Sequence, residues 1–115
     1  MTYLDRMTAA YLDCAAWADA EAHGIDECAP WSAAAREQAR NECADFRDWC
    51  ERKGVNTDGW DAEQLGHDFW LSRNRHGAGF FDRPWADADA LQVLAKTYGG
   101  AYLYTNDAGE IEFGG

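Results

Sequence analysis

The chain has few basic residues, few prolines and no long apolar run. Ten Lys and Arg stand against twenty-one Asp and Glu, so the formal net charge at pH 7 is −11. Nucleic acid and anionic membrane surfaces are usually bound through basic patches, so this scarcity of cations argues against both as direct ligands. No apolar stretch approaches the roughly 18 residues of a membrane span, and residues 1–24 lack the basic and apolar regions of a signal peptide. We therefore expect a cytoplasmic protein.

The sequence also lacks paired cysteines of the CxxC type. Its four cysteines are Cys14, Cys28, Cys43 and Cys50, and none has the spacing of a common zinc site. On one helix, Cys43 and Cys50 would lie about 10 Å apart along the axis, beyond the roughly 7 Å that a disulfide spans. We expect four reduced thiols, no bound metal and no cofactor.

Apolar and aromatic residues are plentiful. The chain is 47% hydrophobic and 14% aromatic, which is richer than a disordered chain of this charge. A length of 115 residues fits one compact domain. We therefore expect residues 1–115 to form a single domain with one core.

Helical periodicity marks three segments, residues 3–23, 30–53 and 86–98. Gly24 and Gly54 follow the first two segments, where a left-handed C-cap belongs. The third stops at a pair of glycines. The apolar stripe expected on the first helix comprises Leu4, Met7, Tyr11, Cys14, Ala15 and Ala18.

Two further segments favour β-hairpins. Residues 67–83 show a short period-two alternation and would turn at Asn74–Arg75, and residues 101–105 and 110–113 alternate on either side of a turn. The order helix, helix, hairpin, helix, hairpin predicts an α+β fold, in which a small antiparallel sheet packs against helices.

Charge is unevenly distributed along the chain. Residues 1–35 carry a net charge of −5, whereas residues 73–83 carry +2. The pattern predicts an acidic surface that binds a basic, nucleic-acid-binding site on another protein. Solubility and local ion pairing are the simpler explanation of the same charges. The residues predicted to contact such a partner are Asp13, Asp19, Glu21, Asp26, Glu27, Glu37, Asp45, Asp48, Trp70, Arg73 and Arg75.

The aromatic residues divide into an expected core and a group that includes surface positions. The first group is Trp17, Trp31, Phe46, Trp49, Phe69, Phe80 and Tyr98. The second group is Trp60, Trp70, Phe81, Trp85, Tyr102 and Tyr104. Some members of the second group are expected to form an exposed binding patch, because Trp, Tyr and Arg dominate interface hot spots.

One polar cluster suggests chemistry as an alternative. In the register of the first predicted hairpin, His67 faces Asp82, and a His–Asp pair can act as a general base. With Asp68 and His76, the same residues could hold a metal, although their spacing matches no strong motif. Hydrogen bonds that pin the ends of a hairpin explain the cluster equally well. No nucleophile stands beside it, so we expect no catalytic residue and no enzyme activity.

The stretch GHDFWLSRNRHGAGFFDR, residues 66–83, resembles a signature of small, mostly uncharacterised bacteriophage and plasmid proteins. The form typical of that family is GHDFWLTRNGHGAGFWDR, followed by a helix and a segment like YLYTNDAGEIEF. This chain departs from it at Arg75, where the family tends to have Gly, and at Phe81, where Trp is common. The resemblance covers about the last half of the chain.

The resemblance implies a mobile-element origin and a place in the cytoplasm of a bacterial host. Small acidic phage proteins include inhibitors of host defence, such as anti-CRISPR and anti-restriction proteins. Three hypotheses follow: an inhibitor that binds a host protein through its acidic surface, a small enzyme or metal protein centred on the His–Asp cluster, and a regulatory or replication adaptor of a mobile element.

Overall fold

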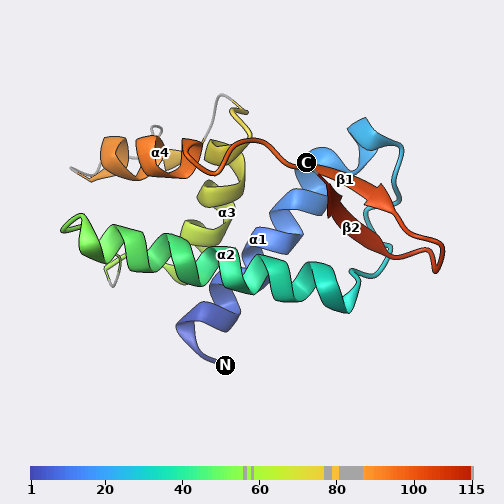
Figure 1. The fold of residues 1–115 in the computed structure, drawn as a ribbon, viewed down its shortest axis with the longest axis horizontal. Coiled ribbons are helices and arrows are strands. Elements are labelled where there is room, and N and C mark those ends of the chain that lie inside the picture. Colours follow the sequence, from blue (N-terminus) through green and yellow to red (C-terminus); the bar gives the residue numbers. More distant parts are fainter. Residues whose placement is uncertain (56, 58, 77–78, 81–86, 115) are drawn as a thin grey trace.

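The computed structural model describes residues 1–55, 57, 59–76, 79–80 and 87–114. Four α-helices precede a two-stranded antiparallel sheet in this part of the chain, which confirms the α+β class (Figure 1). The elements are α1 (Tyr3–Asp19), the 3-10 helix η1 (Glu21–His23), α2 (Ala33–Arg52), α3 (Ala62–Arg73), α4 (Ala88–Lys96), β1 (Tyr102–Thr105) and β2 (Ile111–Gly114).

The first helix begins with a capping box. The hydroxyl of Thr2 accepts a hydrogen bond from the backbone N–H of Asp5, and the Asp5 carboxylate accepts one from the N–H of Thr2. Together they satisfy two N–H groups that have no partner inside the helix. The helix ends at Asp19, and η1 carries the chain on to Gly24, which has a φ of 70°. The predicted helix over 3–23 is thus α1 followed by one 3-10 turn.

The second helix matches its prediction closely. Ser32 caps it, with its hydroxyl accepting from the N–H of Ala35 at 2.9 Å. At the other end, Gly54 has a φ of 80°, and the N–H of Val55 donates to the carbonyl of Cys50 at 2.8 Å. This is a Schellman motif, in which a left-handed residue lets the chain leave the helix while its last carbonyls stay bonded.

The predicted hairpin over 67–83 is wrong for its first strand, because those residues belong to α3. Asp61 caps this helix by accepting from the N–H of Gln64 at 3.0 Å. Every residue from Asp68 to Arg73 is buried, and a helix enclosed on several sides loses the periodicity that identifies helices in a sequence. The chain leaves α3 at Arg75, which has a φ of 58°. Residues 77–78 and 81–83 of the predicted hairpin lie outside the described part.

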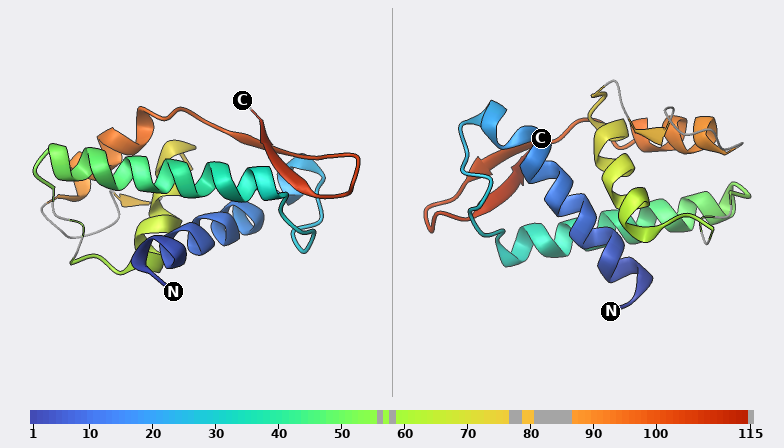
Figure 2. Two further views of the ribbon diagram at one scale, coloured as in Figure 1. Left: turned by 60° about the horizontal axis from the view of Figure 1, so that its bottom comes forward. Right: turned by 180° about the vertical axis from the view of Figure 1, so that it is seen from behind.

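Helix α3 occupies the centre of the fold and packs on α1, as the view from behind shows (Figure 2). A Cβ built on Gly66 would lie 2.1 Å from the carbonyl oxygen of Met7, so only glycine permits this close crossing. The rings of Phe46 and Phe69 stack with centroids 4.2 Å apart and join α2 to the same core. No helix in the described ranges is both long and apolar enough to cross a bilayer.

The sheet is the C-terminal hairpin predicted from the sequence. Leu103 pairs with Phe113 and Tyr104 with Glu112 in an antiparallel register. On its other side, β2 forms a bridge at Ile111 to Trp31, just before α2. This bridge attaches the loop between η1 and α2 to the hairpin, so both belong to the same end of the molecule.

Candidate functional site

One end of the molecule is built mainly from two segments that contain no Lys or Arg. Residues 7–35 form most of α1, then η1 and the loop to α2, and residues 97–114 form the hairpin. In Figure 1 the hairpin lies beside η1 and this loop at the right of the molecule. We call this region the acidic end, because its exposed carboxylates are Asp13, Glu21, Asp26, Glu27 and Asp107.

The acidic end contains an open hollow of about 600 Å³ beside Trp17. Its charged lining residues are Glu21, Asp26 and Glu27. The Trp17 side chain is 68% exposed, an unusual state for so large an aromatic group. Asp13 lies one helical turn before Trp17, and a spacing of four residues places both on the same helical face. The hollow therefore combines an aromatic surface with several carboxylates.

Two tyrosines extend the aromatic surface on the hairpin. Tyr102 and Tyr104 are exposed, as the sequence suggested for some of their group, and their rings lie 6.5 Å apart. His23 of η1 approaches the Tyr102 ring at 6.4 Å, and its Nδ1 accepts the N–H of Leu103 at 3.3 Å. η1 thus joins the hairpin tyrosines to the acidic hollow.

The predicted contact residues of α2 are exposed but lie among basic groups and hydrogen-bond donors. Asp48 pairs with Arg52 at 3.1 Å, and Asp45 accepts a hydrogen bond from the hydroxyl of Tyr98 at 2.6 Å. Glu37 lies on the same exposed surface. Because ion pairs and hydrogen bonds within the protein already engage two of these three carboxylates, α2 presents a weaker negative field than the acidic end.

Three of the predicted contact residues are buried and hold the fold together, which corrects their assignment to a binding surface. Asp19 and Arg73 are 8% and 6% exposed, and Trp70 is fully buried. The Asp19 carboxylate accepts from the indole Nε1 of Trp70, and the Nε2 of His76 lies 3.0 Å from both of its oxygens. These contacts join the end of α1 to α3, so we remove the three residues from the candidate surface.

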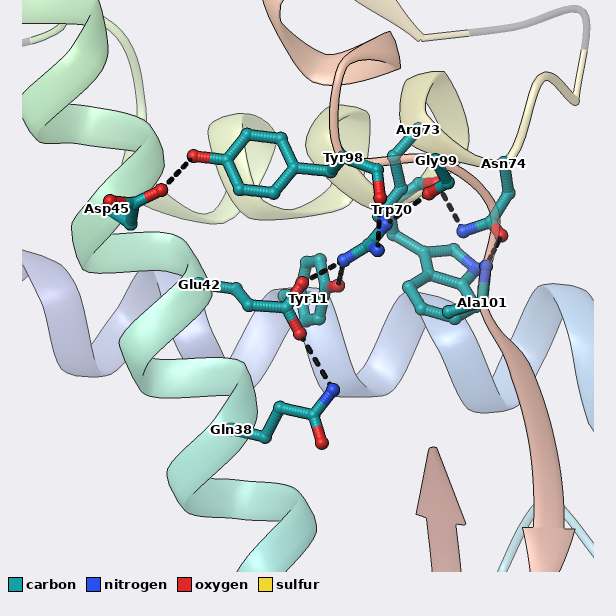
Figure 3. Close-up of polar contacts among 10 residues, drawn as sticks. All are labelled: Tyr11, Gln38, Glu42, Asp45, Trp70, Arg73, Asn74, Tyr98, Gly99 and Ala101. Atoms are coloured by element: carbon teal, nitrogen blue, oxygen red, sulfur yellow. Dashed lines mark hydrogen bonds and ion pairs between the residues drawn. The ribbon is translucent and has the colours of Figure 1, made fainter. Parts of the chain in front are cut away.

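Arg73 is the centre of a buried polar network (Figure 3). Its guanidinium donates to the hydroxyl of Tyr11 at 2.9 Å and pairs with Glu42 of α2. It also donates to the backbone carbonyls of Tyr98 and Gly99. A buried charge with an opposite charge and several acceptors is stable in place. One side chain of α3 therefore connects α1, α2 and the segment before β1.

The basic island predicted over residues 73–83 does not form a patch in the described residues. Arg73 is buried, Arg75 is exposed, and Arg83 lies outside the described part. Arg75 also has a left-handed backbone conformation, at the point where the chain leaves α3. The N–H of His76 donates to the carbonyl of Leu71 and that of Arg75 to Ser72, so Arg75 takes the left-handed position of a second Schellman motif.

The His–Asp cluster of the second hypothesis is arranged differently from the sequence prediction. His67 lies 3.7 Å from the buried carboxylate of its neighbour Asp68, and His76 contacts Asp19 instead. Asp82 lies outside the described residues. Within the part that the structure describes, no three His, Cys, Asp or Glu side chains are grouped so that they could hold a metal.

The buried thiols are poor nucleophiles. Burial raises the pKa of Cys14, Cys43 and Cys50 to about 12, so all three are protonated at neutral pH. All four cysteines are free thiols, and Cys28 is the exposed one.

Trp17 is exposed, so the prediction from the sequence that it belongs to the core is wrong. Trp49 is also more exposed than expected, at 41%, whereas Trp60 and Trp70 are buried. A signal for Trp17 was present in the sequence, because it falls outside the apolar stripe predicted for residues 3–23. It stands instead between Asp13 and Glu21 at spacings of four. An aromatic residue on the polar face of an amphipathic helix is an exposed one.

The arrangement offers a surface on which cations of another molecule can bind. Its elements are an acidic end without Lys or Arg, an exposed indole, and a rigid scaffold fixed by the Arg73 and Asp19 networks. Comparison of the chain with protein-family models, curated proteins and solved structures found no match.

Proposed function

We propose that this chain is a binding protein that docks its acidic end onto the basic, nucleic-acid-binding surface of a bacterial protein. The separation of charge carries the proposal. Residues 7–35 and 97–114 contain no Lys or Arg, whereas Asp5 pairs with Arg40 and Asp48 pairs with Arg52 elsewhere in the fold. Carboxylates without cations from their own chain keep a negative field at the surface, which steers a basic partner toward them.

The biological setting of the proposal comes from the resemblance of residues 66–83 to proteins of bacteriophages and plasmids. In that setting, the chain acts in the cytoplasm of a bacterial host as an inhibitor of a nucleic-acid-targeting defence system, of the anti-CRISPR or anti-restriction kind. Its carboxylates occupy the positions where the target binds phosphates. Direct binding to nucleic acid is disfavoured, because a net charge of −11 repels the phosphate backbone.

The test is capture of partners from a nuclease-treated bacterial lysate, followed by mass spectrometry. We compare the natural chain with an acidic-end variant in which four exposed carboxylates are neutralised. This variant carries Asp13→Asn, Glu21→Gln, Asp26→Asn and Glu27→Gln. The natural chain is expected to retain nucleic-acid-handling proteins at low salt and to release them as ionic strength rises, because salt screens exposed charges. The acidic-end variant is expected to lose them.

A matched control separates local recognition from net charge. The α2 variant carries Glu37→Gln, Asp45→Asn, Asp48→Asn and Glu51→Gln, which removes the same charge from another exposed surface. It is expected to capture the same proteins as the natural chain. Equal capture by the acidic-end variant, or equal loss by both variants, would rule out the acidic end as the binding surface. Capture of a replication or regulatory protein of a mobile element would assign the surface to that partner and end the inhibitor proposal.

A further inference from the structure

The acidic hollow holds an aromatic side chain whose exposure the fold does not explain. Trp17 is 68% exposed, although neighbouring residues of α1 such as Ala15 and Ala16 are buried. Large exposed aromatic groups are common at the centres of protein interfaces, where they supply much of the binding energy. The lining of the hollow limits the chemistry of a ligand, because Glu21, Asp26 and Glu27 line the same hollow as this ring and give it negative charge.

Two other accessible aromatic rings, those of Trp49 and Tyr3, have a cation of this chain over them. The guanidinium of Arg52 lies 5.2 Å from the ring centre of Trp49, and that of Arg47 lies 4.1 Å from that of Tyr3. Among the described residues, no Lys or Arg lies over Trp17. Among the described residues, the fold makes a guanidinium–aromatic contact at Trp49 and Tyr3 but leaves Trp17, like the exposed Tyr102 and Tyr104, without one.

The Trp17 ring is also held in position. The imidazole of His67 lies beside it, with ring centroids 5.9 Å apart and planes inclined by 32°. Trp17 is part of α1, and His67 is part of α3, which packs on α1 at the centre of the fold. Because the Trp17 ring already packs against His67 on one side, it loses less conformational freedom when a ligand stacks on its open side.

From these contacts we infer that the hollow at Trp17 receives an arginine side chain of the protein partner. The guanidinium stacks on the indole and donates its N–H groups to the carboxylates of Glu21, Asp26 and Glu27. Arginine fits better than lysine, because its planar group stacks on aromatic rings and binds carboxylates through two parallel hydrogen bonds. The inference rests on the proposed function and specifies the chemical group that the acidic end recognises.

The negative charge near Trp17 favours an arginine side chain over a nucleic-acid base, which is the other common ligand of an exposed tryptophan. Bases of single-stranded nucleic acid also stack on aromatic side chains, but the proteins that bind them line the backbone path with positive charge. The segment that carries Trp17, residues 7–35, has no Lys or Arg. Phosphates would meet carboxylates here, so the hollow selects a basic protein segment.

The test is a titration with two end-capped peptides, one of alternating arginine and glycine and one of alternating lysine and glycine, followed by calorimetry and NMR at low salt. The natural chain is expected to bind the arginine peptide about two- to fivefold more tightly than the lysine peptide, the range typical of an exposed cation–aromatic contact. The indole N–H signal of Trp17 is expected to shift with the arginine peptide. Trp17→Ala should lose most of this preference and keep only the part that the carboxylates supply.

The matched control is Trp49→Ala, which removes another exposed tryptophan, one that Arg52 already covers. It is expected to keep the preference for arginine. If Trp17→Ala keeps that preference, or if the natural chain binds the two peptides equally, the arginine site is refuted. The acidic-end variant should bind both peptides more weakly. If the acidic-end variant binds both peptides as tightly as the natural chain does, the proposed function fails as well. If the acidic-end variant binds both peptides more weakly while Trp17→Ala keeps the natural preference, only the arginine site fails.

Discussion

The indole Nε1 of Trp70 donates a hydrogen bond to the carboxylate of Asp19, a residue 51 positions earlier in the chain. The sequence suggested that both residues contact a partner, yet the structure places them against each other inside the protein. The bond joins the C-terminal end of α1 to the last turn of α3, and His76 shares the same carboxylate. These contacts attach the end of α1, which adjoins η1 and the acidic end, to α3.

Removing the Asp19 carboxylate is expected to destabilise the fold. Asp19→Ala leaves the buried N–H of Trp70 without its acceptor, which costs about 1–3 kcal/mol of unfolding free energy. Asp13→Ala is the control, because Asp13 lies on the same helix but is exposed, and its cost is expected to stay within about 0.5 kcal/mol. Urea denaturation followed by circular dichroism measures both. Equal effects would contradict a structural role for Asp19.

Breaking the Arg73 network is expected to lower the unfolding free energy more than removing the Asp19 carboxylate does. Arg73→Met keeps most of the side-chain volume but leaves the partly buried carboxylate of Glu42 without its guanidinium. Breaking a buried pair from one side costs about 3–5 kcal/mol. Arg75→Met removes the same charge two residues later from an exposed position, and we expect a change within about 0.5 kcal/mol. Chemical denaturation compares the two, and similar values would show that the Arg73 network contributes little.

Arg75 offers a stabilising substitution. It adopts a φ of 58°, a left-handed conformation that a side chain disfavours. Arg75→Gly is therefore expected to raise the unfolding free energy by about 1 kcal/mol. Gly54 occupies the equivalent position after α2, with a φ of 80° and no atom within 4 Å of a Cβ placed there. Gly54→Ala should accordingly lower stability by about 1 kcal/mol, and thermal unfolding should move in opposite directions for the two variants.

Asp5 gives the fold a specific dependence on acid. Hydrogen bonds from the backbone of Thr2 and from Arg40 lower the pKa of Asp5 from its ordinary value of 3.8 to about 2. Because the pKa is lower in the folded state, the carboxylate adds stability above pH 3.8, and this contribution disappears as the pH falls toward 2. Asp5→Asn should flatten this part of the profile of unfolding free energy against pH, whereas the exposed turn variant Asp107→Asn should not.

Much of the fold could be predicted because local signals agree with it. Pro30 and Ser32 precede α2, Gly54 follows it, and the alternation of residues 110–113 describes a strand with one buried face. The segment over α3 was misread for a physical reason. Phe69, Trp70, Leu71, Ser72 and Arg73 are all buried, so the helical period of 3.6 does not stand out. The short alternation there arose by coincidence.

The candidate site was predictable in its charge but not in its geometry. Residues 7–35 include Glu21, Asp26 and Glu27 of the hollow, and the absence of Lys and Arg from this segment is visible in the sequence. The burial of Asp19 and Arg73 was not visible, because each has a partner far away in the chain. Pairing at such separations depends on the packing of α3, whose residues 67–73 the sequence predicts as a strand.

The stretch 66–83 contributes several contacts to the fold. Its described residues include Gly66 at the crossing with α1, Arg73 in the buried network, and His76 beside Asp19. Asn74 donates to the carbonyl of Trp70 and accepts the N–H of Ala101, which ties α3 to the segment before β1. Residues 66–76 therefore include several that stabilise the scaffold, whereas the proposed interaction surface lies mostly on α1, η1 and the following loop.

The most direct test of the proposed function is competition between this protein and duplex DNA for a captured partner. The partner is first bound to the immobilised chain, and a short duplex is then added at constant ionic strength. If the acidic end covers the nucleic-acid-binding surface, the duplex releases the partner in proportion to its concentration, and free protein likewise displaces the partner from immobilised DNA. A stable complex that contains the chain, the partner and the duplex together would contradict the account.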